Sequence, residues 1–345
     1  MSFNESQPNK RYSQYTQQPK GVAFFLGTWS GRIILVNSII FLMMSIESGS
    51  LFLPTNDVLI TYGAKDPLSL TRGEIWRLVT PIFVHVGLIH FAFNSWALYV
   101  LSYQIESIIG GRWFVVLYLF SGLLGNIASS VFSVAISAGA SSSVFGLLGG
   151  GFYIEKMIGR YLKNRLGGRG AGSGMYTGLI VVNLILGILI PDIDNAAHIG
   201  GLIGGLALTA MIFSIQPNHL TKTNKQLGAI ISIVVVVLGG TGLYFGTSQR
   251  YIGNQFVVHG DESTNLRNKY IYYSQALMID PHNMNIIFKR GKILLLAGQF
   301  HEAFADFSVI SQHQEYINKI ADLRQKFIED GNIKGAVWLK QFLLR

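Results

Sequence analysis

The sequence predicts an all-α polytopic membrane protein: a six-helix bundle plus one C-terminal transmembrane helix, followed by a small helical soluble domain. The 345 residues are 50% hydrophobic and only 13% charged, whereas about a quarter of the residues of an ordinary globular domain are charged. Uncharged stretches recur from Arg32 to about Gln249, and each is close to the roughly 20 residues that a helix needs to cross a bilayer. This composition excludes a soluble enzyme for most of the chain.

The apolar stretches predict seven spans, of which the first is interrupted by Glu47. A polar segment over 1–30, rich in Gln, Asn, Ser and basic residues, precedes them and is expected to be a disordered tail. The transmembrane domain covers 31–250. The predicted spans are 32–54, 81–104, 113–135, 141–159, 173–191, 196–216 and 226–247.

Basic residues mark one side of the predicted membrane. Because Lys and Arg concentrate in cytoplasmic loops, this side is expected to be cytoplasmic, and spans two, four and six then begin at the outer face. This topology explains the net charge of +9 better than nucleic-acid binding, and no nucleic-acid partner is expected. The absence of organelle signals favours a bacterial plasma membrane. The basic residues are Lys10, Arg11, Lys20, Arg32, Arg112, Lys156, Arg160, Lys163, Arg165, Arg169, Lys222 and Lys225.

The chain changes character after the seventh span, where charged residues become frequent and helical periodicity appears. The segment 255–345 is expected to be a soluble domain outside the cytoplasm, because seven crossings carry the chain to the outer side. It could bind a protein partner. About one repeat, with a weaker copy toward Ala336, has spacings that resemble the tetratricopeptide repeat, which leaves open a short capped array or a looser helical hairpin. The residues at these spacings are Ala276, Pro281, Gly291, Gly298, Ala303 and Phe307.

Three groups of polar residues occur toward the outer ends of alternate spans. They are His90 with Asn94, the run Gly139 to Ser142, and His198. An unpaired polar group in hydrocarbon costs several kcal/mol, so such groups are expected to be paired or functional. A serine, a histidine and further donors at one depth are what acyl transfer requires.

Glycine pairs four residues apart predict how these groups approach. Gly146 with Gly150 in span four, and Gly201 with Gly205 in span six, would let two backbones pack closely. Each polar residue alone has an ordinary structural explanation, since a serine often begins a helix and a buried histidine or asparagine often bridges helices. Only their joint placement indicates chemistry.

Other intramembrane protease chemistries lack support in the sequence. There is no cysteine, no His-Glu-x-x-His pair for zinc, and no aspartate pair inside the spans. Asp192 and Asp194 fall in a loop, where solvation accounts for them. Neither a metal nor a cofactor is expected.

Over about 32–247 the chain resembles the rhomboid family of intramembrane serine proteases. Four motifs carry the resemblance in order and spacing, and together they are far more specific than any one of them. They are Glu74-Ile-Trp76-Arg77, Phe83-Val-His85 followed by His90-x-x-x-Asn94, Gly139-Ala-Ser141 followed by Phe145-Gly146, and Ala197-His198-x-x-Gly201-x-x-x-Gly205.

The resemblance implies a serine endopeptidase with a Ser-His dyad. Ser141 would be the nucleophile and His198 the general base, with no third carboxylate required. His90 and Asn94, together with the backbone N–H of Ser141, would bind the oxyanion. The substrates would be transmembrane segments of other membrane proteins, cut in surrounding lipid.

The resemblance also implies supporting roles. Phe145 would pack against the His198 ring, and Gly139 would allow the tight backbone around the nucleophile. Trp76 and Arg77 would shape the loop beside the bundle. One departure is Ser142, which stands where the family has a glycine.

Two other functions are compatible with parts of the sequence. A catalytically silent rhomboid relative would bind and sort membrane proteins, but such relatives typically lack the serine or the histidine, and this chain has both. A small-solute channel or transporter would account for glycine-rich spans with polar groups, but not for the placement of Ser141 and His198.

Overall fold

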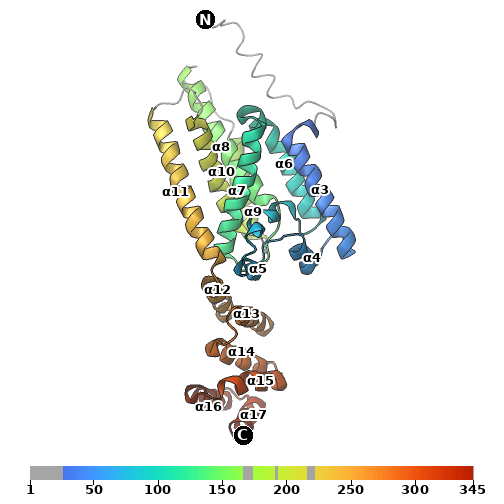
Figure 1. The fold of residues 1–345 in the computed structure, drawn as a ribbon, viewed down its shortest axis with the longest axis vertical. Helices are drawn as coiled ribbons and strands as arrows, with labels where there is room; N and C mark the ends of the chain where they lie inside the picture. Colours follow the sequence, from blue (N-terminus) through green and yellow to red (C-terminus); the bar gives the residue numbers. More distant parts are fainter. Residues whose placement is uncertain (1–25, 166–173, 191–192, 216–221, 345) are drawn as a thin grey trace, which may run out of the picture. The chain divides into compact units, whose positions relative to one another are not determined.

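The computed structural model describes residues 26–165, 174–190, 193–215 and 222–344, which divide into two compact units between Thr247 and Ser248 (Figure 1). Every regular element in these ranges is helical, which confirms the predicted all-α class. Most of the predicted tail lies outside the described residues. So do five residues on which the topology and loop predictions depend, namely Lys10, Arg11, Lys20, Arg169 and Asp192.

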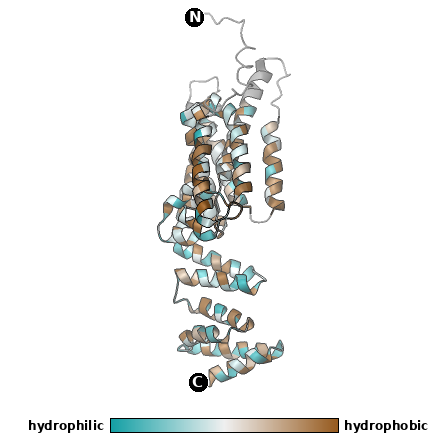
Figure 2. Cartoon of the chain, turned by 90° about the vertical axis from the view of Figure 1, so that its right-hand side faces the viewer, coloured by the Kyte–Doolittle hydropathy of each residue, from teal (hydrophilic) through white to brown (hydrophobic). Residues whose placement is uncertain are grey.

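Among its described residues, the first unit has one long helix at each of the seven predicted spans. Four of them, α3, α7, α10 and α11, contain stretches long and apolar enough to cross a membrane, while α9 is apolar but has only 15 residues. Figure 2 shows long hydrophobic stretches on these helices, the pattern of an integral multi-pass membrane protein. The bounds are α3 (Trp29–Ser48), α6 (Leu88–Ile109), α7 (Gly111–Phe132), α8 (Ser141–Arg165), α9 (Met175–Leu189), α10 (Asn195–Ile215) and α11 (Lys222–Thr247).

Several span boundaries differ from the prediction, and two of these differences have local reasons. The first span ends at Ser48 rather than at 54, because Gly49 adopts a left-handed conformation (φ 64°) and its N–H caps the helix. The second begins at Leu88 rather than at 81. Pro81 lies instead in a short 3-10 helix, where its missing N–H leaves no helical hydrogen bond broken.

The segment between α3 and α6 folds into short helices at one end of the bundle (Figure 1). Its backbone hydrogen bonds to Ser137 and Gly139 place it beside the start of α8. Thr55 and Asp66 cap the first two by accepting backbone hydrogen bonds with their side chains. We call residues 49–87 the connecting segment. Its elements are α4 (Asn56–Thr61), α5 (Pro67–Thr71), η1 (Ile75–Leu78) and η2 (Thr80–Phe83).

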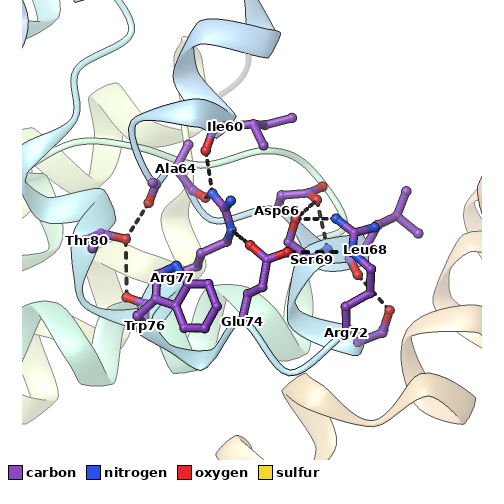
Figure 3. A network of polar contacts seen from close by, with 12 residues as sticks. Ile60, Ala64, Asp66, Leu68, Ser69, Arg72, Glu74, Trp76, Arg77 and Thr80 are labelled. Carbon is purple, nitrogen blue, oxygen red and sulfur yellow. Dashed lines mark hydrogen bonds and ion pairs between the residues drawn. The ribbon is translucent and has the colours of Figure 1, made fainter.

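A buried arginine organises this segment (Figure 3). The Arg77 guanidinium donates to the Glu74 carboxylate at 2.7 Å and to the backbone carbonyls of Ile60 and Ala64. The Thr80 hydroxyl donates to the backbone carbonyl of Gly63 at 2.6 Å. A planar guanidinium can satisfy several acceptors at once, so Arg77 fixes the backbone around residue 64.

The core of the bundle forms where α8 packs against α7 and α10. Glycines allow backbone to meet backbone there: a Cβ atom built at Gly205 would lie 2.0 Å from the Gly146 carbonyl oxygen, and one built at Gly201 would lie 2.0 Å from the Ser142 carbonyl oxygen. Large apolar side chains fill the remaining space. They include Phe114, Leu117, Tyr118, Leu147, Leu148, Leu208 and Ile212.

The second unit begins at Ser248, whereas the sequence suggested a start near 255. Its consecutive helices pack against each other in pairs, and hydrophilic and hydrophobic residues are mixed along them (Figure 2). Gly291 in α14 lies against the Phe307 ring of α15, while Arg290 pairs with Asp306 at 2.6 Å. The bounds are α12 (Gln249–Glu262), α13 (Leu266–Ile279), α14 (Met284–Leu296), α15 (Phe300–Ile310), α16 (Gln314–Glu329) and α17 (Ile333–Leu343).

Several residues whose spacing resembles the tetratricopeptide repeat lie at buried or turn positions in these helix pairs. Ala276, Ala303 and Phe307 are buried, and Gly298 makes the turn between α14 and α15 with a φ of 77°. Such helical hairpins are compatible with the repeat interpretation, which stays a prediction.

Candidate active site

Ser141 is the first residue of α8 and follows a loop tied to the connecting segment. Gly139 donates its backbone N–H to the Pro81 carbonyl at 2.9 Å, and Ser137 and Lys65 exchange two backbone hydrogen bonds. Gly139 has a φ of 143°, a value that side-chain-bearing residues rarely adopt. These contacts fix the backbone that leads into Ser141.

His198 lies in the first turn of α10, and its Nε2 is 2.9 Å from the Ser141 hydroxyl oxygen. The Phe145 ring, one turn after Ser141 on α8, stacks on the imidazole with centroids 4.1 Å apart and planes 13° apart. His198 is 8% exposed, and its Nδ1 has no hydrogen-bond partner among the described residues. The arrangement is a Ser-His pair with an aromatic support under the imidazole.

The close contact of α8 and α10 explains how the pair forms. Gly201, one turn after His198, lies directly against the backbone of Ser142. Gly125 of α7 is also closely packed, since a Cβ there would lie 2.5 Å from the Ala197 carbonyl oxygen and 2.6 Å from the Ser142 Cβ. Because no side chain separates α8 from α10 at this level, the Ser141 hydroxyl and the His198 imidazole reach hydrogen-bonding distance.

Only one serine of the run 141–143 faces the histidine. Ser142 is 1% exposed, with its side chain against Gly125 of α7 and its backbone against Gly201 of α10. Ser143 donates its hydroxyl to the Tyr118 carbonyl at 2.7 Å. Ser142, which occupies the family's glycine position, therefore fits without displacing Ser141.

Polar groups of α6 lie beside the loop that leads to Ser141. The His90 ring is packed so closely on Gly139 that a Cβ there would lie 2.4 Å from the imidazole. Asn94, one turn further, is buried and donates one amide hydrogen to the His90 carbonyl at 2.9 Å. Among the described residues this amide group has no further acceptor, so its second hydrogen can still donate. The first N–H groups of α8, at Ser141, add donors and the positive end of the helix dipole.

The remaining residues suggested by the motifs do not touch the Ser-His pair. Trp76 is 55% exposed on η1, and Arg77 binds the connecting segment (Figure 3). Gly205 serves the contact with Gly146.

The interpretation of Asp194 as a solvated loop residue is wrong. Its Oδ1 accepts the Ala197 backbone N–H at 3.0 Å, and its Oδ2 accepts the Ser129 hydroxyl. An acidic residue just before an apolar helix is a typical N-cap, so this spacing could have revealed the role. Lys65, which is 0% exposed, was not predicted either, because no local sequence pattern marks it.

Comparison with known proteins identifies the family. The rhomboid domain model matches residues 72–215. Rhomboid protease GluP of Bacillus subtilis (strain 168) is 35% identical over 64% of this chain and 40% of its own length. RHOMBOID-like protein 1 of Arabidopsis thaliana is 33% identical over 58% of this chain and 49% of its own length. This chain thus spans less than half of either relative. RHOMBOID-like protein 6, mitochondrial, of Arabidopsis thaliana is 34% identical over 58% of this chain and 68% of its own length. The motifs, the helical bundle and these relatives together show that the chain belongs to the rhomboid family.

Proposed function

We propose that this chain is an intramembrane serine endopeptidase that cuts transmembrane segments of other proteins. The observation that carries the proposal is the 2.9 Å contact between His198 Nε2 and Ser141 Oγ, with Phe145 stacked on the imidazole. A nucleophile within reach of its base is the geometric signature of covalent catalysis. Relatives named as rhomboid proteases support the same reaction.

The first half of the reaction would form an ester on the enzyme. His198 Nε2 takes the proton as Ser141 Oγ attacks the scissile carbonyl carbon, and the carbonyl oxygen becomes an oxyanion. The His90 ring, the free amide hydrogen of Asn94 and the backbone N–H of Ser141 are the proposed donors to it. Collapse breaks the C–N bond, and the leaving amine takes its proton from His198.

The second half would release the acyl group. Water gives a proton to His198 and attacks the Ser141 ester, and the hydroxyl regains its proton as the second oxyanion collapses. Water must therefore reach the site. A helical substrate must also unwind locally, because hydrogen bonds of an intact helix shield its carbonyl groups.

Labelling with a fluorophosphonate tests the nucleophile. Purified wild-type protein should be labelled and should cleave a reporter transmembrane segment in proteoliposomes, whereas folded Ser141→Ala and His198→Ala should do neither. Ser142→Ala is the matched control, since it removes a neighbouring hydroxyl that does not face His198. Labelling retained in folded Ser141→Ala would refute the assignment.

The proposed setting is a bacterial plasma membrane with the N-terminus in the cytoplasm and residues 255–345 outside it. The basic loops and the odd number of spans support this topology. Protease added to right-side-out vesicles should remove a C-terminal tag. Protection of the tag until lysis would show that the topology is wrong.

The helical domain over 255–345 is proposed to bind a protein partner, such as a substrate's extramembrane part. Deleting it should reduce cleavage of substrates with large ectodomains more than cleavage of an isolated transmembrane reporter. Equal loss for both would indicate that the domain only stabilises the bundle.

A further inference from the structure

Lys65 is a fully buried ammonium group whose atoms the proposed reaction does not use. Its main chain exchanges two hydrogen bonds with Ser137, at 2.8 and 3.0 Å, just before the nucleophile's helix. Its Nζ donates to the Ser129 hydroxyl at 2.7 Å and to the Ser133 carbonyl at 3.1 Å, at the end of α7. One residue thus joins the connecting segment, the end of α7 and the loop that leads to Ser141.

The chain of contacts continues from Ser129 to the helix that carries the base. The Ser129 hydroxyl accepts from Lys65 and donates to Asp194. Asp194 accepts the Ala197 N–H with its side chain, at 3.0 Å, and the His198 N–H with its backbone carbonyl, at 3.1 Å. Asp194 therefore fixes where the first turn of α10 begins and where His198 lies in that turn.

We propose that Lys65, Ser129 and Asp194 form a positioning chain that holds the first turn of α10, and with it His198, in place relative to Ser141, on helices whose spacing the glycine contact sets. One end holds the backbone before the nucleophile, and the other caps the helix that bears the base. This inference rests on the proposed protease function, because only there does the separation of the two groups matter. All three are positioning residues, since none of them contacts the reacting atoms.

The electrostatic environment favours the charged forms of Lys65 and Asp194, the two ends of the positioning chain. The charged groups that face Lys65 are Asp194 and Asp66. Burial lowers the pKa of Lys65 to about 8, and both carboxylates oppose this shift. Burial alone would raise the pKa of Asp194, but Lys65, Ser129 and the Ala197 N–H hold it below its usual value. Each charge is thus stabilised by the other in a site from which water is largely excluded.

The arrangement of the connecting segment explains why Lys65 stays in place. Arg77 donates to the Ala64 carbonyl at 3.2 Å, and Asp66 accepts from the backbone and hydroxyl of Ser69 at 2.8 and 2.6 Å (Figure 3). Both neighbours of Lys65 in the chain are therefore fixed. The ammonium is presented to Ser129 by a backbone that has little freedom to move.

Two substitutions probe the chain without adding bulk. Ser129→Ala removes the hydroxyl that relays between the charges, and Asp194→Asn keeps an oxygen that can cap the helix but removes the charge. Matched controls are Ser107→Ala and Asp57→Asn, which alter exposed residues outside the site. In proteoliposomes, Ser129→Ala and Asp194→Asn should each lower kcat about tenfold, a change of roughly 1.4 kcal/mol, and leave KM unchanged. The controls should match wild type.

A double variant distinguishes one connected positioning chain from two contacts that act independently. Members of one hydrogen-bonded network are non-additive, so Ser129→Ala combined with Asp194→Asn should lose no more activity than the worse single variant. A loss equal to the product of the two single losses would overturn the proposal, as would unchanged kcat in folded Asp194→Asn. Lys65→Met should behave like the others; if it fails to fold, the first two variants still decide.

Hydrogen exchange distinguishes failure of this inference from failure of the proposed function. Amides of Ala197 and His198 should exchange faster in Ser129→Ala and Asp194→Asn than in wild type, with no change in the controls. If wild-type protein cleaves nothing, the protease proposal fails and the exchange rates alone decide whether the chain positions α10. Unchanged exchange at these amides would overturn the positioning chain, whatever the activity.

Discussion

Gly201→Ala should separate the two reactive groups without touching either of them. A Cβ at this position would lie 2.0 Å from the Ser142 carbonyl oxygen, 2.8 Å from its carbonyl carbon and 3.2 Å from its Cα. All three atoms belong to the backbone, so no side-chain rotation can relieve the overlap. The helices must move apart.

The size of the movement follows from these separations. Real Cβ atoms essentially never approach closer than 3.0 Å, so α10 must shift by about 1 Å at Gly201, one turn from His198. A misplacement of about 1 Å can cost roughly a hundredfold in rate, which corresponds to about 2.7 kcal/mol of activation free energy. We expect kcat for a transmembrane reporter to fall by about this factor.

Steady-state cleavage in proteoliposomes measures the effect, with hydrogen exchange to show that the bundle remains folded. The matched control is Gly178→Ala in α9, where an added Cβ would meet nothing within 4 Å. This control should retain wild-type kcat. The reasoning is refuted if folded Gly201→Ala cleaves within threefold of wild type, or if Gly178→Ala is equally impaired.

Four further changes test other parts of the structure. Asn94→Ala should lower kcat by roughly one to three powers of ten, the range for one oxyanion donor among several; an unchanged rate would leave Asn94 with a packing role. Phe145→Ala removes the ring stacked on His198 and should lower kcat about tenfold in protein that is still folded. If Phe145→Leu and Phe145→Ala are equally active, stacking on the imidazole is not what Phe145 contributes. Arg290→Met leaves the Asp306 carboxylate, 7% exposed, without its partner and should destabilise the second unit by about 3 kcal/mol, seen as faster exchange in α14 and α15; no acceleration would contradict it. Because the pKa of Lys65 in the folded protein is lowered from 10.5 to about 8, its charge is lost as the pH rises past 8, so kcat should fall there. The folded protein binds fewer protons than the unfolded chain between pH 8 and 10.5, so stability should rise in that window as activity falls. Lys65→Met should lack both trends.

The fold class could be predicted because a bilayer leaves so few solutions for an apolar chain. Backbone groups in hydrocarbon must be satisfied within each segment, so a long uncharged run implies a helix. Boundaries were harder to predict where apolar residues continue past the helix. The residues from Pro81 to Gly87 are as apolar as a span, yet they form a 3-10 turn and a loop before α6.

The residues of the candidate site likewise differ in whether the sequence alone could predict them. Ser141, His198, His90 and Asn94 stand out because polar residues are unusual inside apolar spans. Asp194 did not, because a carboxylate beside a membrane normally faces water. Its relay to Lys65 through Ser129 joins three separate segments, and no local pattern in one sequence reveals such a contact.

The glycine contact between α8 and α10 has a consequence for how the protein responds to its lipid surroundings. Gly201 and Gly205 place backbone directly on backbone, so the separation of these helices is set by the thickness of the main chain and not by side-chain rotamers. In contrast, many large apolar side chains of α3 and α11 are exposed. A helix with an exposed apolar surface adapts to a thicker or thinner bilayer by tilting. Changes in bilayer thickness should therefore be absorbed by α3 and α11, while the distance between Ser141 and His198 stays constant.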